Sequence, residues 1–278
     1  MITAIVFTKN EENRINLVLK NLKNFSDIIV FDGGSEDGTE EICKKYKVKF
    51  IRRPEYLVDF CGKEYEWAMS QVNTPYVLLV NCSHHYPSRL LKEFKSIASN
   101  GKYHAVYHDI IIYSYGQIVQ RPFIRRRSSA CNFFRVDAIN FEKSVIHNEV
   151  PVDIDKNLIV HLEPSDSLSI HLFRDYDLNK TELNHGRYSI FEASQRFEHG
   201  KRSSFLKIII RPLRVFIYQY IRCGSILRGS AGLIVSLLNS YLELSIQIRL
   251  WEIERGLNLK KIRDIHSEIR EKMINSKF

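Results

Sequence analysis

The sequence lacks several features that would assign it to common protein classes. Its five cysteines are scattered over 278 residues without the paired spacings of metal-binding motifs, which predicts reduced thiols in a cytosolic compartment. No Gly-x-Gly-x-x-Gly follows the first apolar stretch, which argues against a dinucleotide-binding dehydrogenase. Met1 runs directly into that stretch, so no secretory signal is expected.

Acidic residues are missing from one long part of the chain. Residues 201–228 contain seven Lys and Arg and no Asp or Glu. Residues 201–278 carry the whole net charge of +9, with 15 basic and 6 acidic residues, so residues 1–200 are neutral with 26 of each. Because a nucleic-acid enzyme carries its positive charge around its groove, this distribution argues against a nucleic-acid partner.

Two short apolar runs, each followed at once by polar residues, organise the N-terminal half. Ile2–Phe7 leads into Thr8–Glu12, and Ile28–Phe31 leads into Asp32–Thr39. Apolar runs without polar alternation are typical of buried strands in a parallel sheet, and ligands of such sheets bind at the carboxyl ends of the strands. The two polar segments are therefore expected to be neighbours at one edge of a sheet.

Helical and extended patterns alternate through the rest of this half. Helices are expected at about 11–24, at 39–46 and around Trp67, and strands at 48–51 and 76–80. Strand–helix alternation with short loops predicts an α/β fold, with a mixed, mainly parallel sheet flanked by helices. Residues 103–162 favour further strands and loops.

Four polar motifs accompany these expected elements. They are Thr-Lys-Asn-Glu-Glu from Thr8, Val-Phe-Asp-Gly-Gly-Ser-Glu-Asp-Gly-Thr from Val30, Arg-Pro at Arg53, and the helix that contains Lys63. Together they resemble the motifs of family 2 glycosyltransferases of the Rossmann-like GT-A fold. More narrowly, the chain resembles lipopolysaccharide core glucosyltransferases of the WaaE/KdtX type, and the resemblance resumes after residue 174.

The resemblance implies a nucleotide-sugar donor, with a UDP-sugar expected, at the carboxyl edge of the sheet. The resemblance also implies that Asp32 hydrogen-bonds the base or the ribose, a contact that suits a carboxylate because it accepts from two donors at once. The alternative for Thr8, Glu11 and Asp37 is a capping role only. The expected donor-binding residues are Thr8, Asn10, Glu11, Asp32, Gly34, Arg53, Lys63, Asn81 and Ser83.

The end of the fourth strand departs from the family pattern. The family has Asp-x-Asp there, which holds a divalent metal against the donor diphosphate, whereas this strand ends in Asn81-Cys82-Ser83. Mg²⁺ and Mn²⁺ prefer charged oxygen ligands, so Asn81 and Ser83 are weak candidates, and His85 suits a softer metal. Three alternatives stay open: a weakly held metal, neutralisation of the diphosphate by basic groups such as Arg53, or a degenerate enzyme.

A dense basic stretch in the middle of the chain contains Arg125 and Arg126. The planar guanidinium is suited to bidentate phosphate contacts, so these residues are expected to bind a phosphate of the donor or of the acceptor. The alternative is a solvated loop that carries no ligand.

The next candidate is His147-Asn148-Glu149. In the resembled family a His-Glu pair occupies this place, near the acceptor. An inverting transferase needs a base for the proton of the acceptor hydroxyl, so Glu149 is expected to be that base and His147 its orienting partner. Asp137 and Asp153 are the fallback bases.

The basic stretch after residue 200 has the pattern of an amphipathic helix. Lys207, Arg211, Arg214 and Arg222 fall within one arc at about 100° per residue, beside an apolar, aromatic-rich surface. This pattern favours a helix that lies in the interface of an anionic membrane. A spanning helix is disfavoured because the best apolar run, 231–248, contains Glu243. The alternative is a helical hairpin that packs on the preceding domain.

These inferences predict three regions: a GT-A domain at 1–200, basic amphipathic membrane-associating helices at 201–255 and a charged helix at 256–278. The expected protein is a peripheral enzyme on the cytoplasmic face of the inner membrane. It would transfer a sugar, with inversion, to a lipid-linked saccharide such as lipopolysaccharide core or another surface glycan. The alternative is a catalytically degenerate relative that acts as a membrane-bound scaffold.

Overall fold

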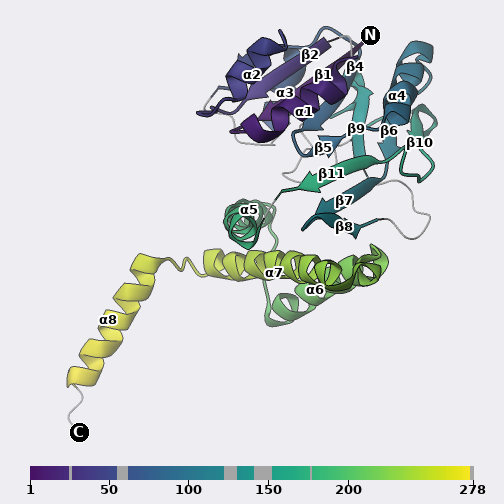
Figure 1. The fold of residues 1–278 in the computed structure, drawn as a ribbon. Helices are drawn as coiled ribbons and strands as arrows, with labels where there is room; N and C mark the ends of the chain where they lie inside the picture. Colours follow the sequence, from purple (N-terminus) through teal and green to yellow (C-terminus); the bar gives the residue numbers. More distant parts are fainter. Residues whose placement is uncertain (25–26, 55–61, 122–129, 141–151, 176, 276–278) are drawn as a thin grey trace. The chain divides into compact units, whose positions relative to one another are not determined.

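The chain forms two compact units, Met1–Asp175 and Tyr176–Phe278. The structure is a computed structural model, shown in Figure 1. It describes residues 1–24, 27–54, 62–121, 130–140, 152–175 and 177–275.

A seven-stranded sheet with the order β10-β6-β9-β4-β1-β2-β3 is the centre of the first unit. Six of its strands run parallel, and β9 runs antiparallel between β4 and β6. The parallel strands are β1 (Ile2–Thr8), β2 (Asp27–Asp32), β3 (Lys49–Arg52), β4 (Tyr76–Asn81), β6 (Ala105–His108) and β10 (Ile159–His161); β9 is Ala130–Arg135. The predicted mixed, mainly parallel sheet of the GT-A class is confirmed.

Helices cover both faces of this sheet, which explains why its strands lack polar alternation. All seven residues of β1 are buried: Ala4 and Val6 pack with α1 and α4, and Ile5 and Phe7 pack with α3. Ile15, Val18, Leu19 and Leu22 of α1 are buried in the same core as Ala4 and Val6. The helices of this unit are α1 (Glu12–Leu22), α2 (Thr39–Lys45), α3 (Gly62–Ser70) and α4 (Ser88–Asn100).

A second, four-stranded sheet has the order β5-β11-β7-β8. β5 (His84–His85) follows the end of β4 after two residues, and β7 (Ile110–Ser114) follows the end of β6 after one. The other two strands are β8 (Gln117–Gln120) and β11 (Ile170–Arg174). This small sheet therefore begins at the carboxyl edge of the large one.

The second unit is helical. Its helices are α5 (Leu178–Glu198), α6 (Phe205–Ile217), α7 (Gly229–Glu254) and α8 (Leu259–Asn275), with the short turns η4 (Tyr218–Arg222) and η5 (Ser225–Arg228) between α6 and α7. Helix α5, which lies within the predicted 1–200 region, packs on α7. Its Ala193 lies with Ile246 and Leu250 in one core, and Arg196 forms a bidentate ion pair with Glu243.

One helical segment of the described chain, Ser225–Glu254, is long and apolar enough to cross a membrane by length and composition. The same two properties belong to core helices of soluble proteins, and 39% of the apolar window of this segment is buried inside the structure. Glu243, the acidic residue within this apolar run, is among its buried residues.

Candidate functional site

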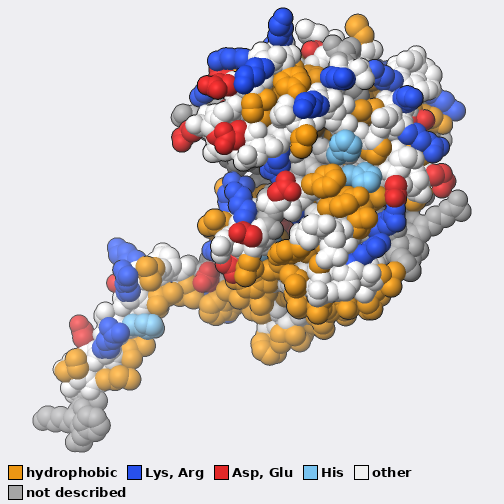
Figure 2. Space-filling model, in the orientation of Figure 1, with side chains coloured by type: hydrophobic (Ala, Val, Ile, Leu, Met, Phe, Trp, Pro, Cys, Tyr) orange, Lys and Arg blue, Asp and Glu red, His pale blue; other side chains and the backbone are white. Residues whose placement is uncertain are grey.

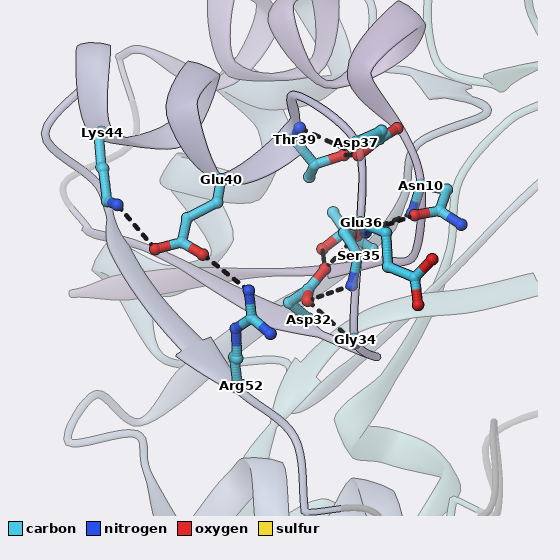
Figure 3. A network of polar contacts seen from close by, with 11 residues as sticks. Asn10, Asp32, Gly34, Ser35, Glu36, Asp37, Thr39, Glu40, Lys44 and Arg52 are labelled. Atoms are coloured by element: carbon cyan, nitrogen blue, oxygen red, sulfur yellow. Dashed lines mark hydrogen bonds and ion pairs between the residues drawn. The ribbon is translucent and has the colours of Figure 1, made fainter.

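The carboxyl ends of β1 and β2 lie side by side, as the sequence predicts (Figure 3). Thr8 is in register with Asp32, and the Thr8 hydroxyl donates a hydrogen bond of 3.0 Å to the Asp32 carboxylate. The amide of Asn10 donates to the Ser35 hydroxyl at 2.8 Å, and the Asn10 side-chain oxygen accepts from the Glu36 amide at 2.9 Å. The two polar segments thus form one network, called here the strand-end network.

Asp32 is the centre of the strand-end network and is fully buried. Besides Thr8, its carboxylate accepts hydrogen bonds from the Gly34 amide at 2.9 Å and from the amide and hydroxyl of Ser35 at 2.7 and 2.5 Å. In this structure the carboxylate therefore holds its own loop. Contact between Asp32 and a nucleotide stays a prediction. The local spacing Asp-Gly-Gly-Ser is the signal that could have indicated this loop-forming role.

The start of α1 is tied to the start of α2. The Glu11 amide donates to the Thr39 hydroxyl at 2.8 Å, and the Glu12 amide donates to Asp37 at 3.1 Å. Asp37 also accepts from the Thr39 amide at 3.0 Å, which agrees with the predicted capping role. Burial acts to raise the pKa of Asp37, but the hydrogen bonds from Thr39 and the Glu12 amide lower it below its ordinary value. These amides are already satisfied within the chain.

The predicted basic residues of the site differ in exposure. Arg53 donates to Glu64 at 2.6 Å, and their side chains are only 10% and 3% exposed. A Cβ atom added at Gly33 would lie 3.2 Å from the Arg53 guanidinium, so the glycine makes room for this arginine. Lys63 is exposed on α3. Glu64 was not predicted, because no local pattern connects it with Arg53.

The other predicted donor residues lie at the rim of the network. Asn10 and Gly34 are exposed and have positive φ angles of 55° and 88°, which glycine and asparagine adopt most readily. The Glu11 carboxylate accepts two hydrogen bonds from Arg14, at 2.6 and 2.7 Å. Glu11 is therefore paired with Arg14, while Asn10 and Gly34 are the exposed residues at this rim.

The end of β4 supplies neutral oxygens. Asn81 and Ser83 are half-buried, and His84 is buried while His85 is exposed, so the two imidazoles point to opposite faces of β5. Within the described ranges, no three His, Cys, Asp or Glu side chains group in a way that could hold a metal ion. The segment alone does not fit a tightly held hard cation, which prefers carboxylate ligands.

The fallback bases lie away from this edge. Arg135, the last residue of β9, donates to Asp137 at 2.6 and 2.9 Å. The amide of Val136, between them, donates to the carbonyl of Pro75, which precedes β4. Asp153 donates its amide to the Ala138 carbonyl in the same region. Because β9 is antiparallel to β4, both aspartates lie at the edge opposite the strand-end network.

The remaining candidates, Arg125, Arg126, His147 and Glu149, lie outside the described residues. Their assigned roles in phosphate binding and in base catalysis stay predictions.

Burial of His84 has a consequence that can be measured. Burial and the nearby His108 lower the pKa of His84 to about 3, so the folded chain keeps this imidazole neutral. In the unfolded chain His84 binds a proton below about pH 6.5, whereas in the folded chain it stays neutral. Stability is therefore unaffected by His84 above that pH and decreases as the pH falls below it. Between pH values of about 7.5 and 5, we expect His84 to remove about 2 kcal/mol from the free energy of unfolding.

Urea unfolding at both pH values measures this loss. In a Trp251→Phe background, Trp67 of α3 is the single remaining tryptophan and reports on the first unit. A His84→Gln variant should show a smaller loss than the parent, with part of the remainder due to His108, whose pKa burial lowers to about 4. Equal losses in both proteins would contradict the assignment.

Comparisons with known proteins agree on one family. A family model described as glycosyl transferase family 2 matches residues 3–152. The lipopolysaccharide core biosynthesis glycosyltransferase LpsC of Rhizobium meliloti is 21% identical over 244 residues, which cover 84% of this chain and 85% of that protein. An uncharacterized glycosyltransferase of Rickettsia typhi is 21% identical over 283 residues, which cover 100% of this chain and 91% of that protein.

Solved structures are similar over a shorter part. The crystal structure of glucosyl-3-phosphoglycerate synthase from Mycobacterium tuberculosis, in complex with Mn²⁺, uridine-diphosphate and glucosyl-3-phosphoglycerate, is 17% identical with a TM-score of 0.33. The match covers 41% of this chain and 44% of that chain, so it spans less than half of the solved protein. The family model, in contrast, covers more than half of this chain and includes the whole strand-end network, and the chain therefore belongs to glycosyl transferase family 2.

Proposed function

We propose that this chain transfers a sugar, with inversion, from a nucleotide-sugar donor to a lipid-linked saccharide such as lipopolysaccharide core or another surface glycan. The expected donor is a UDP-sugar. The observation that carries the proposal is the family 2 match over the strand-end network, at the edge where parallel sheets bind ligands. The similarity to a lipopolysaccharide core glycosyltransferase supports the class of acceptor.

The charges at the site favour basic side chains as the partners of the donor diphosphate. The first amides of α1 are used within the strand-end network, and the end of β4 carries neutral oxygens. We propose that Lys63, together with the predicted Arg125 and Arg126, neutralises most of the diphosphate charge, because the charge of Arg53 is already balanced by Glu64. Glu149 would take the proton of the acceptor hydroxyl as that oxygen attacks the sugar carbon and the nucleoside diphosphate leaves.

Calorimetric titration of the full chain with UDP-glucose, with and without Mn²⁺, tests the donor site. We expect binding in both conditions and a loss of about tenfold in affinity for Lys63→Ala, since one charge-assisted phosphate contact contributes about 1.5–3 kcal/mol. The control is Lys102→Ala, at an exposed lysine near the opposite edge of the sheet. Absence of binding in both conditions would overturn the enzyme proposal.

The second candidate function is a catalytically degenerate family member that acts as a membrane-bound scaffold. It is favoured by the replacement of both expected acids with Asn81 and Ser83. Binding of UDP-glucose without release of UDP, in the presence of a lipopolysaccharide acceptor preparation, would support this candidate over the enzyme.

We also propose that α6 and α7 hold the chain at an anionic membrane surface, as a peripheral protein on the cytoplasmic face of the inner membrane. Both helices expose large apolar side chains, which gather over α6 and α7 in Figure 2. Lys207, Arg214 and Arg222 are exposed in the same region. Each such basic residue contributes about 1 kcal/mol to binding near an anionic leaflet. The exposed apolar residues of α6 are Phe205, Leu206, Ile209, Ile210, Leu213 and Ile217.

Truncation of this apolar face should release the chain from vesicles. Phe205 and Leu206 are 77% and 63% exposed, so Phe205→Ser with Leu206→Ser should leave the fold intact. We expect binding to vesicles with anionic phosphatidylglycerol to fall about tenfold or more, because each side chain contributes about 1.5–3 kcal/mol when it is removed from water. Co-sedimentation measures this change.

The matched control is Met273→Ser with Ile274→Ser on α8, where the side chains are 66% and 81% exposed. This helix is expected to stay in solution, so the control should bind as the parent does. Equal loss in both double variants would contradict the assignment of the membrane face to α6.

A further inference from the structure

Four ring side chains form a surface on the small sheet of the first unit. In register, Phe173 of β11 pairs with Tyr113 of β7, and His171 of β11 pairs with His85 of β5. Residues that are paired in register, and residues two apart on one strand, point to the same face of a sheet. Tyr113, Phe173, His171 and His85 therefore share one face, which is called here the ring platform.

The rings of the platform are stacked and partly open to solvent. The ring centroids of Tyr113 and Phe173 are 4.5 Å apart with an angle of 19° between the planes, and those of Tyr113 and His171 are 5.6 Å apart at 26°. Phe173 remains 39% exposed and His85 is exposed. Figure 2 shows imidazoles beside hydrophobic side chains over β5, β11 and β7. A stacked, exposed ring surface is available to a flat ligand.

Hydrogen bonds fix the orientation of these rings. His171 Nε2 lies 2.9 Å from the carbonyl oxygen of Asp166, and Nδ1 lies 2.9 Å from the Tyr113 hydroxyl. A carbonyl oxygen can only accept, so Nε2 carries the proton and Nδ1 accepts from Tyr113 when the imidazole is neutral. The platform is therefore pre-organised, and a ligand that binds it does not have to order these side chains.

The platform begins beside the expected donor site. The Phe173 amide donates to the carbonyl oxygen of Ser83 at 2.8 Å, and Ser83 lies two residues after the end of β4. This places the exposed phenyl ring next to the segment where the family holds the donor diphosphate. In a transferase, the acceptor hydroxyl attacks the sugar carbon that is bonded to this diphosphate, so the acceptor must bind beside the donor site.

We propose that the ring platform binds a sugar ring of the acceptor saccharide, an inference that rests on the proposed function. A pyranose has an apolar face of C–H groups and a rim of hydroxyl groups. The C–H groups carry a partial positive charge and pack on the negative face of an aromatic ring such as Phe173. The imidazole of His85, at the edge of the platform, can exchange hydrogen bonds with the hydroxyl rim.

Ligand-observed saturation-transfer NMR of the full chain, with the methyl glycosides of glucose, galactose and mannose as probes, tests the platform. We expect transfer to the ring C–H protons of at least one glycoside and a loss of at least fivefold in Phe173→Leu, which keeps an apolar side chain without the ring. Phe173→Tyr should keep the signal. The control is Tyr103→Leu, which removes a ring just before β6. This ring lies near the edge of the large sheet that is opposite the strand-end network.

Calorimetry with UDP-glucose on the same preparations separates the two proposals. If the parent binds UDP-glucose but no glycoside, or if Phe173→Leu binds glycosides as the parent does, the platform proposal is overturned and the proposed function stands. If the parent does not bind UDP-glucose, the proposed function fails, whatever the glycosides show. Thermal melting of each variant confirms that the first unit remains folded, and Phe173→Tyr keeps the test decisive if Phe173→Leu does not.

Discussion

Replacement of Asp32 by alanine is expected to lower the free energy of unfolding of the first unit by about 3–5 kcal/mol. The carboxylate is fully buried and accepts from the Thr8 hydroxyl, the Gly34 amide and both donors of Ser35. Alanine would leave the donors of Thr8 and Ser35, which are both buried residues, without this acceptor, and each such loss costs about 1–3 kcal/mol. Asp32→Asn should cost less, because one acceptor oxygen remains.

Urea unfolding followed by Trp67 in the Trp251→Phe background measures this effect. Trp67 packs on Phe31, the residue before Asp32, with ring centroids 4.9 Å apart. The control is Asp137→Ala, at an exposed ion pair with Arg135, where we expect a loss of less than about 1 kcal/mol. If Asp32→Ala lost no more than this control, the carboxylate would not be what holds the loop.

Replacement of Glu243 by glutamine is expected to lower the stability of the helical unit by about 3 kcal/mol. Arg196 donates two hydrogen bonds to Glu243, at 2.7 and 2.9 Å, and Gln247 donates a third at 2.9 Å. The variant would leave the half-buried Arg196 with its weaker partner Glu192, at 3.1 Å. Burial acts to raise the pKa of Glu243, but Arg196 lowers it below its ordinary value overall. The ion pair therefore stabilises the fold at pH values above the ordinary pKa of a glutamate, and this stabilisation is lost as the pH falls through the lowered pKa.

Trp251 reports on this unit in a Trp67→Phe background, and detergent micelles keep the exposed apolar face of α6 in solution. A double variant, Arg196→Leu with Glu243→Leu, removes both charges and should recover most of the lost stability, since buried ion pairs are often replaceable by apolar side chains. A double variant as unstable as Glu243→Gln would show that packing, rather than an unpaired charge, causes the loss.

The strand-end network could be predicted because its signals are local. An apolar run that ends in polar residues identifies a buried strand, and parallel pairing then brings Thr8 and Asp32 together at one edge. The function of the Asp32 carboxylate was harder to assign. Its residue type is the same whether it faces a nucleotide or its own loop, and the structure places it against the loop.

Features that depend on distant partners could not be predicted. Arg53 forms an ion pair with Glu64, although no periodic pattern connects the two positions. Arg196 forms an ion pair with Glu243 on another helix. The second contact explains why α5 packs with the helices that follow it, although its residues fall within the predicted 1–200 region. The ring platform combines residues of three strands, and no single stretch of sequence indicates that they are neighbours.

The Arg196–Glu243 pair also bears on the synthesis of the chain. Arg196 lies 47 residues before Glu243, so it has already left the ribosome when α7 emerges. If α7 passed into lipid during translation, it would carry Glu243 near its midpoint away from water, at a cost of about 2.5–3.5 kcal/mol. Pairing with Arg196, which is already outside the ribosome, avoids this cost. The order of synthesis therefore favours packing of α7 on α5 over its insertion across the bilayer.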